Sequence, residues 1–161
     1  MAPERIRRAL RLRAAVPADL PRLSELAERL ADFGPPAWRT SGEIVEGELR
    51  TVRRHLESPA PDAALVVAAD GAEAVGFVYV ETLTDYFTGL RHGHIGILSV
   101  AKEAEGTGVG GALLGFAEDW ARQRGYAILT LNVFDGNRRA RSVYERRGYA
   151  PETLRYVKAL G

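Results

Sequence analysis

The 161-residue sequence contains no cysteine. This absence excludes disulfide bonds, thiolate metal sites and a cysteine nucleophile. The three histidines, His55, His92 and His94, do not form the i,i+4 pair that is typical of a metal site on a helix. A chain of this length can bury a hydrophobic core that is large enough to be stable without a disulfide bond or a structural metal ion. The composition therefore predicts a protein that needs neither a disulfide nor a metal ion.

Long apolar segments are also missing. No run approaches the roughly 20 apolar residues that span a bilayer. Residues 1–5 carry charge, but the apolar segment of a secretory signal does not follow them. The net charge of +1 is too small to favour nucleic-acid binding by bulk electrostatics. These absences predict a cytoplasmic protein with no membrane or nucleic-acid partner, and they leave a homodimer open.

The elements that are present predict one mixed domain over residues 1–161. Apolar residues make up 46% and charged residues 27%, an ordinary globular balance. The hydrophobic periodicity and the turn signals define the element order. We expect strands at 7–15, 63–69, 74–82, 94–100, 127–133 and 153–160, and helices between Asp19 and Gly34 and at 41–56, 108–124 and 137–147. This order is that of an α/β (α+β) domain and not of a purely alternating one.

A glycine-rich loop joins the strand at 94–100 to the helix that follows it. Its sequence is EGTGVGG, from Glu105 to Gly111. Glycines allow a sharp turn and a close approach of the backbone to a ligand, and the free N–H groups at a helix start favour an anion. The loop therefore indicates a phosphate-bearing ligand, although glycines of this kind also occur in plain turns.

Two phosphate-binding motifs fit this loop poorly. Gly106, Gly108 and Gly111 satisfy the dinucleotide pattern G-x-G-x-x-G, and Asp135 lies near the place of its ribose-binding acid. However, residues 101–105 separate the strand from the first glycine. The 50 residues after Gly111 are also too few for the second half of a doubly wound sheet. A P-loop is excluded because no Gly-Lys-Ser/Thr is present.

A third interpretation rests on two motifs together. The segment GTGVGGALL at residues 106–114 resembles the diphosphate-binding motif of the GCN5-related N-acetyltransferases, and NRRARSVYERRGY at 137–149 resembles their second cofactor motif. The resemblance covers nearly the whole chain. It implies a single, mostly antiparallel mixed sheet with a central splayed parallel pair, 94–100 and 127–133, flanked by helices. It also implies direct transfer of an acetyl group from acetyl-CoA, without a metal, to a primary amine of a small molecule or peptide.

The resemblance also implies which residues bind the coenzyme. The backbone amides of two residues on the first splayed strand would meet the thioester and the pantetheine, and the glycine loop would hold the diphosphate. These cofactor-binding residues are Leu98, Val100, Glu105, Gly106, Gly108, Gly110, Gly111, Asn137 and Tyr144. Glu105 departs from the family's usual glutamine or arginine. A carboxylate beside a diphosphate is unfavourable by Coulomb's law unless its side chain turns outward.

Four residues are candidates for proton transfer. By the resemblance, Tyr144 would protonate the leaving thiolate, and a phenol with a pKa near 10 remains able to donate at neutral pH. His94 starts the first splayed strand, where an imidazole suits the general base. Glu81 and Asp85 are the competing bases. A non-catalytic acyl-CoA sensor of the same fold is the alternative function.

The amine pocket is expected to contain aromatic and acidic residues. Aromatic rings can pack against an apolar or cationic amine, and carboxylates can attract its charge. We expect these residues to come from the first two helices, the loop at 84–93 and the last strand. They are Phe33, Trp38, Asp85, Tyr86 and Phe87, with Tyr156, Glu81 and Glu43 at the margin.

Overall fold

The computed structural model describes residues 10–161 and contains one five-stranded sheet. Its strands follow one another in the order β1-β2-β3-β4-β5, with antiparallel pairing from β1 to β4 and parallel pairing between β4 and β5. Their bounds are Arg11–Ala14 (β1), Ala63–Asp70 (β2), Glu73–Thr84 (β3), Arg91–Val100 (β4) and Leu129–Leu131 (β5). The predicted mixed, mostly antiparallel sheet with one parallel pair is confirmed.

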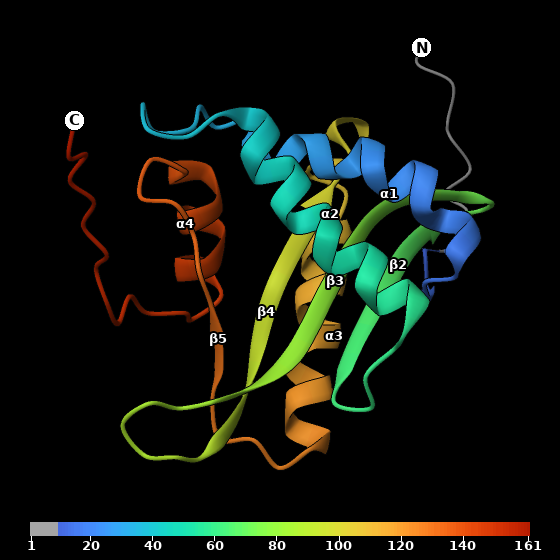
Figure 1. Cartoon of the computed structure of the whole chain (residues 1–161). Coiled ribbons are helices and arrows are strands. Elements are labelled where there is room, and N and C mark those ends of the chain that lie inside the picture. Colours follow the sequence, from blue (N-terminus) through green and yellow to red (C-terminus); the bar gives the residue numbers. More distant parts are fainter. Residues whose placement is uncertain (1–9) are drawn as a thin grey trace.

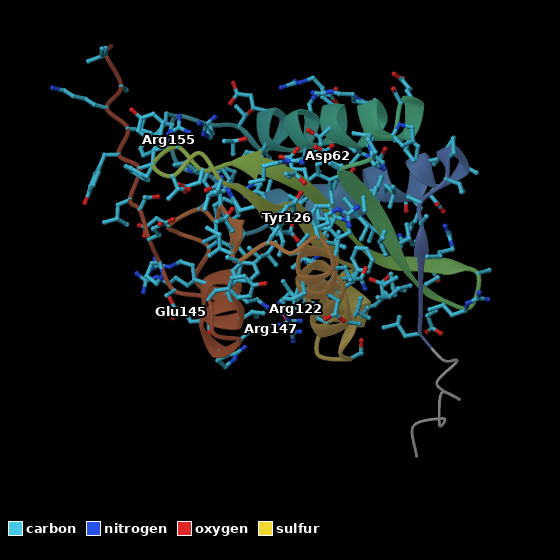
Figure 2. The ribbon with its side chains drawn as sticks, turned by 90° about the horizontal axis from the view of Figure 1, so that it is seen from below. Asp62, Arg122, Tyr126, Glu145, Arg147 and Arg155 are labelled. Atoms are coloured by element: carbon cyan, nitrogen blue, oxygen red, sulfur yellow. The ribbon has the colours of Figure 1, made fainter. Side chains whose placement is uncertain are left out.

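Helices cover both faces of this sheet. The helices α1 and α2 lie on one face, and α3 and α4 lie on the other (Figures 1 and 2). Their bounds are Leu20–Ala27 (α1), Ser41–Glu57 (α2), Val109–Gln123 (α3) and Arg138–Arg146 (α4). Three 3-10 helices complete the order: η1 (Pro17–Asp19), η2 (Glu28–Ala31) after α1, and η3 (Lys102–Ala104) before the glycine loop.

The helices form where the sequence supplies a start signal and an apolar face. Thr40 and Glu43 make a reciprocal capping box at the start of α2, so Glu43 is engaged in the cap. In α3, Leu113, Leu114 and Ala117 are fully buried against the sheet. Burial of each large apolar side chain stabilises the fold by about 1.5–3 kcal/mol.

The two faces of β3 and β4 differ in polarity near β5. A Cβ added at Gly93 would meet Leu129 at 3.0 Å and Ala121 at 3.1 Å, so Gly93 faces α3. Because side chains alternate along a strand, His92 and His94 point to the opposite face, toward α2. Glu81 pairs directly with His94 and shares this face. The α3 side of the sheet is therefore apolar here, while the α2 side carries titratable groups.

The prediction of a last strand at residues 153–160 is wrong. Residues 151–161 form no strand, and Leu154, Tyr156 and Leu160 are exposed. This tail runs along the outside of the molecule, away from β5, and Arg155 lies at the molecular edge (Figures 1 and 2). The alternation of apolar residues specifies which side chains share a face, but it does not supply a neighbouring strand to pair with.

The loss of that strand changes the sheet's edge. The parallel pair β4–β5 closes one side of the sheet instead of lying in its centre. The strand predicted at 127–133 shortens to three residues, since pairing with β4 extends only from Gly93↔Leu129 to Ile95↔Leu131. Residues 7–9 of the first predicted strand lie outside the described residues.

Candidate active site

The glycine loop has the geometry of an anion site. Gly106 and Gly108 adopt positive φ angles of 71° and 93°, a region that favours glycine. A Cβ at either position would meet nothing within 4 Å, so the loop faces open space. The first helical bond of α3 runs from the Ala112 N–H to the Gly108 carbonyl. The N–H groups of residues 109–111 therefore lack intrahelical partners and are free to bind an anion.

Glu105 is turned away from these amides and toward two arginines. Its carboxylate forms an ion pair with Arg139 of α4 at 2.7 Å and a second one with Arg29 of η2. The hydrogen bond from Arg139, together with the charge of Arg29, lowers the pKa of Glu105. Arg29 also donates from Nε to the Val100 carbonyl at 3.2 Å. The carboxylate expected to oppose a diphosphate is thus neutralised, and it ties η2 and α4 to the loop.

The parallel strands separate next to this loop. Pairing between β4 and β5 ends at Ile95↔Leu131, five residues before the end of β4 at Val100. The Ala101 N–H donates to the Val75 carbonyl on the β3 side. Because successive amides alternate in direction, the amides of Val100 and Leu98 point to the other edge, where β5 has ended. A splayed strand pair therefore presents backbone donors beside the glycine loop.

Helix α4 places two candidate residues near this gap. Asn137 caps the helix by accepting a hydrogen bond from the Ala140 N–H at 3.2 Å. Tyr144 lies two turns further along, with its ring 5.9 Å from that of Tyr149. Within residues 10–161, no hydrogen bond engages the Tyr144 hydroxyl, and burial raises its pKa. The phenol is therefore protonated at neutral pH and available as a donor.

The histidine expected to act as a base contacts a threonine of β5. His94 Nδ1 lies 2.8 Å from Thr130 Oγ1 on β5, and Thr130 Oγ1 donates to the Gly93 carbonyl at 3.4 Å. Both contacts are satisfied when the Thr130 hydroxyl donates to Gly93 and His94 Nδ1 donates to Thr130. Nε2 then carries a free lone pair. Burial lowers the pKa of His94 although the charge of Glu81 opposes the shift, so the imidazole is neutral near pH 7.

Three residues missed at the sequence level extend this group toward α2. The ring of His55 lies 5.5 Å from that of Tyr79, and the Tyr79 hydroxyl donates to Glu81 at 3.3 Å. Burial, with the charge of Glu81, raises the pKa of Tyr79 to about 12. Glu48 shares the helix face of His55, because seven residues make two turns. We call Glu48, His55, Tyr79, Glu81, His94 and Thr130 the α2-side cluster.

The family model of the Acetyltransferase (GNAT) family matches residues 23–149. The chain belongs to this family. It is 28% identical over 144 residues to an uncharacterized N-acetyltransferase, YhfO, of Bacillus subtilis, covering 89% of this chain and 92% of the relative.

Solved structures of acetyltransferases share the fold. A putative acetyl transferase from Pyrococcus furiosus is 26% identical, with a TM-score of 0.71 over 94% of this chain and 100% of the other. An aminoglycoside N-acetyltransferase solved in complex with CoA is 17% identical, with a TM-score of 0.71 over 95% and 96% of the two chains. The latter likeness supports the GNAT fold alone.

The aromatic residues expected around the amine do not come together in this GNAT protein. Phe33 stacks on Phe134 with ring centroids 5.0 Å apart, and Trp38 is 51% exposed. Tyr86 and Phe87 contact each other at the tip of the β3–β4 hairpin and are 91% and 81% exposed. Figure 1 places that tip at the opposite end of the molecule from the connection between α1 and α2.

Asp85 has a local structural task in the same hairpin. Its carboxylate accepts hydrogen bonds from the Phe87 and Thr88 amides, and these bonds hold the turn and lower the pKa of Asp85. Tyr156 lies in the unpaired tail and is 87% exposed. Of the residues expected at the amine, only Glu81 lies in the α2-side cluster.

A surface hollow of about 350 Å³ lies on the other side of the GNAT sheet. Arg122 and Arg147 border it and both pair with Glu118, and Figure 2 shows the two arginines close together. This hollow is lined by residues of α3, by Ile128 and Leu129 at the start of β5, and by the residues that follow α4, on the face of the sheet opposite His94. Within residues 10–161, no helix combines the length and apolarity that a membrane crossing requires.

Proposed function

We propose that this GNAT protein transfers an acetyl group from acetyl-CoA directly to a primary amine of a small molecule or peptide. The observation that carries the proposal is the separation of β4 from β5 beyond Ile95, next to a glycine loop with free helix-start amides. Unpaired backbone donors require a partner, and an extended amide-bearing arm that ends in a diphosphate meets both parts of the site. The aminoglycoside N-acetyltransferase that shares this fold was solved in complex with CoA, the product form of the donor proposed here.

The chain's own groups divide the binding of the donor between them. The amides at residues 109–111, with the open backbone at Gly106 and Gly108, suit the diphosphate. The outward amides of Leu98 and Val100 suit the pantetheine arm and the thioester carbonyl. Bound acetyl-CoA supplies an activated acetyl thioester. An N–H aimed at that carbonyl stabilises the negative charge that develops on its oxygen during attack.

Two side chains handle the protons of the reaction. His94 Nε2 takes a proton from the ammonium of the acceptor, directly or through water, so that the neutral nitrogen can form the new C–N bond. The carbon–sulfur bond breaks and leaves a thiolate. The Tyr144 hydroxyl donates its proton to that sulfur. The second proton of the attacking nitrogen, which is lost as the amide forms, returns to the tyrosinate directly or through water, and His94 releases its proton to solvent. Glu81, opposite His94, is the competing proton acceptor.

Release of free thiol from acetyl-CoA in the presence of a panel of primary amines tests the proposal. We expect turnover with at least one amine and acetylation of its nitrogen by mass spectrometry. Binding of CoA in calorimetry without turnover on any amine would support the acyl-CoA sensor instead.

Tyr144→Phe tests the acid. This change removes the proton donor and keeps the ring, so turnover should fall by about 10²-fold or more while the affinity for CoA stays close to that of the wild type. Unchanged turnover would remove Tyr144 from the mechanism.

A further inference from the structure

The half-buried carboxylates of residues 10–161 differ in how their charge is balanced. Most of them pair with arginine within 3.0 Å: Asp19 with Arg13, Asp62 with Arg91, Glu105 with Arg139 and Glu118 with Arg147. Asp85 is bonded within its own turn. Glu48 and Glu81 alone among these half-buried acids have neither an ion pair nor a turn of this kind within the described part of the chain. The protein contains ample arginine, yet it leaves these two charges without a cation.

Both unpaired carboxylates belong to the α2-side cluster. Glu81 faces His94 across β3 and β4 and accepts the hydroxyl of Tyr79. Glu48 reaches the cluster from α2. Four residues after it, Val52 is fully buried in the core, and seven residues after it, His55 packs on Tyr79. This spacing places Glu48 on the sheet-facing side of the helix, above the same polar area.

The neighbouring titratable groups do not supply the missing positive charge. Burial lowers the pKa of both His55 and His94, so their imidazoles are neutral near pH 7. Arg54 is exposed and its charge acts on Tyr79, but within residues 10–161 it forms no ion pair with either acid. Burial, with the negative charge of Glu81, raises the pKa of Glu48. The two acids therefore repel each other and lie in an environment that favours the arrival of a cation.

A buried histidine nitrogen without a hydrogen-bond partner lies on the face of β4 that points toward α2. His92 is only 8% exposed, and its Nδ1 has no hydrogen-bond partner within the described residues. It stands two residues before His94, opposite Leu83, on the face that points toward α2. The charge of His92 acts on His94, so the two rings are neighbours on this face. Buried polar atoms in native proteins are usually satisfied, so an orphaned ring nitrogen next to His94 indicates a polar ligand.

We propose that the acceptor carries two ammonium groups, the reacting one at Glu81 and His94 and a second one at Glu48. This inference rests on the proposed function and narrows its substrate to a diamine or a larger polycationic amine. A dication neutralises both acids at once. An amine that carries a carboxylate would add a third negative charge to the cluster and would be disfavoured by Coulomb repulsion.

Three amines of equal chain length test the proposal: butane-1,4-diamine, butylamine and 4-aminobutanoate. Their distal ends are an ammonium, a methyl group and a carboxylate. A hydrogen bond to a charged group contributes enough to expect kcat/KM for the diamine to exceed that for butylamine roughly tenfold or more. We expect 4-aminobutanoate to be the poorest substrate. Equal rates for diamine and butylamine, or a preference for 4-aminobutanoate, would overturn the proposal.

The variant Glu48→Gln assigns the preference to one side chain. The amide keeps the shape of glutamate without its charge, so the diamine-to-butylamine ratio of kcat/KM should fall toward one. The matched control is Glu57→Gln on the same helix, because Glu57 is exposed at the end of α2. The control should keep the wild-type ratio. A ratio that survives in Glu48→Gln contradicts the role of Glu48.

Calorimetry separates this inference from the acetyl-transfer reaction itself. The probe is butane-1,4-diamine, titrated at low salt into the protein saturated with CoA, with butylamine as the comparison. Tighter binding of the diamine without any release of thiol from acetyl-CoA would uphold the dication site and reject acetyl transfer. Thiol release at the same rate with both amines would uphold transfer and reject the dication site.

Discussion

The glycine loop and the α2-side cluster both contain half-buried glutamates, but the two regions balance their charges in opposite ways. Glu105 beside the loop lies between Arg29 and Arg139. Glu48 and Glu81, on the other side of β4, have no such partner in residues 10–161. At the loop, arginines neutralise the charge of Glu105 next to backbone amides that suit an anion. In the cluster, the charges of Glu48 and Glu81 have no such partner, and the ligand proposed there is a cation.

The contrast shows that a carboxylate's partners, more than its presence, indicate its task. A glutamate held by arginines fixes the relative position of the elements that supply them. A glutamate without them remains able to bind a ligand. The following substitutions change one region at a time, so each one tests whether the two regions act separately.

The largest effect is expected from His94→Ala. Removal of the base should lower kcat/KM by about 10²–10⁴-fold near neutral pH. Burial lowers the pKa of His94, so the wild-type rate should fall only as the pH falls through that lowered value. The variant can use only the fraction of the amine that is already deprotonated in water. Its kcat/KM should therefore approach that of the wild type as the pH rises toward the amine's own pKa, about 10.

A pH–rate profile of both proteins measures this difference. The affinity for CoA, whose binding we assign to the other region, should stay unchanged in His94→Ala. If kcat/KM depended on pH in the same way in both proteins, the base would be Glu81 or water and not His94.

Arg139→Ala should weaken the binding of CoA by roughly tenfold, a loss of about 1.4 kcal/mol. The change leaves Glu105 with Arg29 as its only described partner and so exposes a negative charge beside the loop. Adding Glu105→Gln should restore most of the affinity, because the uncompensated charge is then gone. Calorimetry with CoA measures both steps.

Arg138→Ala is the matched control for this charge effect. Arg138 is the neighbouring exposed arginine of α4 and forms no ion pair within the described residues. Equal losses in Arg138→Ala and Arg139→Ala would mean that general positive charge, and not the pairing with Glu105, matters for the coenzyme.

Thr130→Val should lower kcat/KM by about fivefold, the effect of one neutral hydrogen bond. The change removes the hydroxyl that contacts His94 Nδ1 at 2.8 Å and that would accept its proton. Nitrogen NMR of the imidazole should show Nδ1 protonated in the wild type and a mixture of tautomers in Thr130→Val. Thr130→Ser keeps the hydroxyl and should restore both the rate and the tautomer. An Nε2-protonated wild type would refute this arrangement.

The smallest effect is a change in stability from Glu48→Gln. The pKa of Glu48 is raised in the folded protein by burial and by Glu81. Between the ordinary glutamate pKa and this raised value, the folded state binds more protons than the unfolded state, so stability falls as the pH rises. The glutamine variant lacks this loss and should melt on the order of 1–2 °C higher at neutral pH. A lower melting temperature would contradict the uncompensated charge assigned to Glu48.

The sequence predicted the features that depend on local order. The loop from Glu105 to Gly111 and the helix from Asn137 to Tyr144 are continuous stretches whose glycine, cap and spacing are visible without any partner. The antiparallel strands also follow from short-range patterns. The predicted last strand failed because its apolar alternation is a local property, whereas pairing requires a neighbouring edge that residues 151–161 do not reach.

The parts that the sequence did not predict depend on distant contacts. Arg29 and Glu105 are 76 residues apart, so the neutralisation of the carboxylate is invisible along the chain. Glu48 was missed although its spacing from His55 was available, because nothing in a helix pattern tells which sheet residues will lie below it. The loop position and aromatic character of Tyr86 and Phe87 predict a place at the amine, but both are exposed at the tip of the long β3–β4 hairpin, away from α2.

Strand β4 uses different atoms for the two proposed substrates, and this division has an evolutionary consequence. Its edge offers the amides of Leu98 and Val100 to the donor, and no side-chain substitution other than proline removes an amide. Its α2 face offers His94, opposite Glu81, to the acceptor through side chains, which single mutations can replace. Acceptor preference can therefore drift by point mutation while donor binding is inherited intact, so a scaffold of this kind can diversify its substrates without first losing its coenzyme.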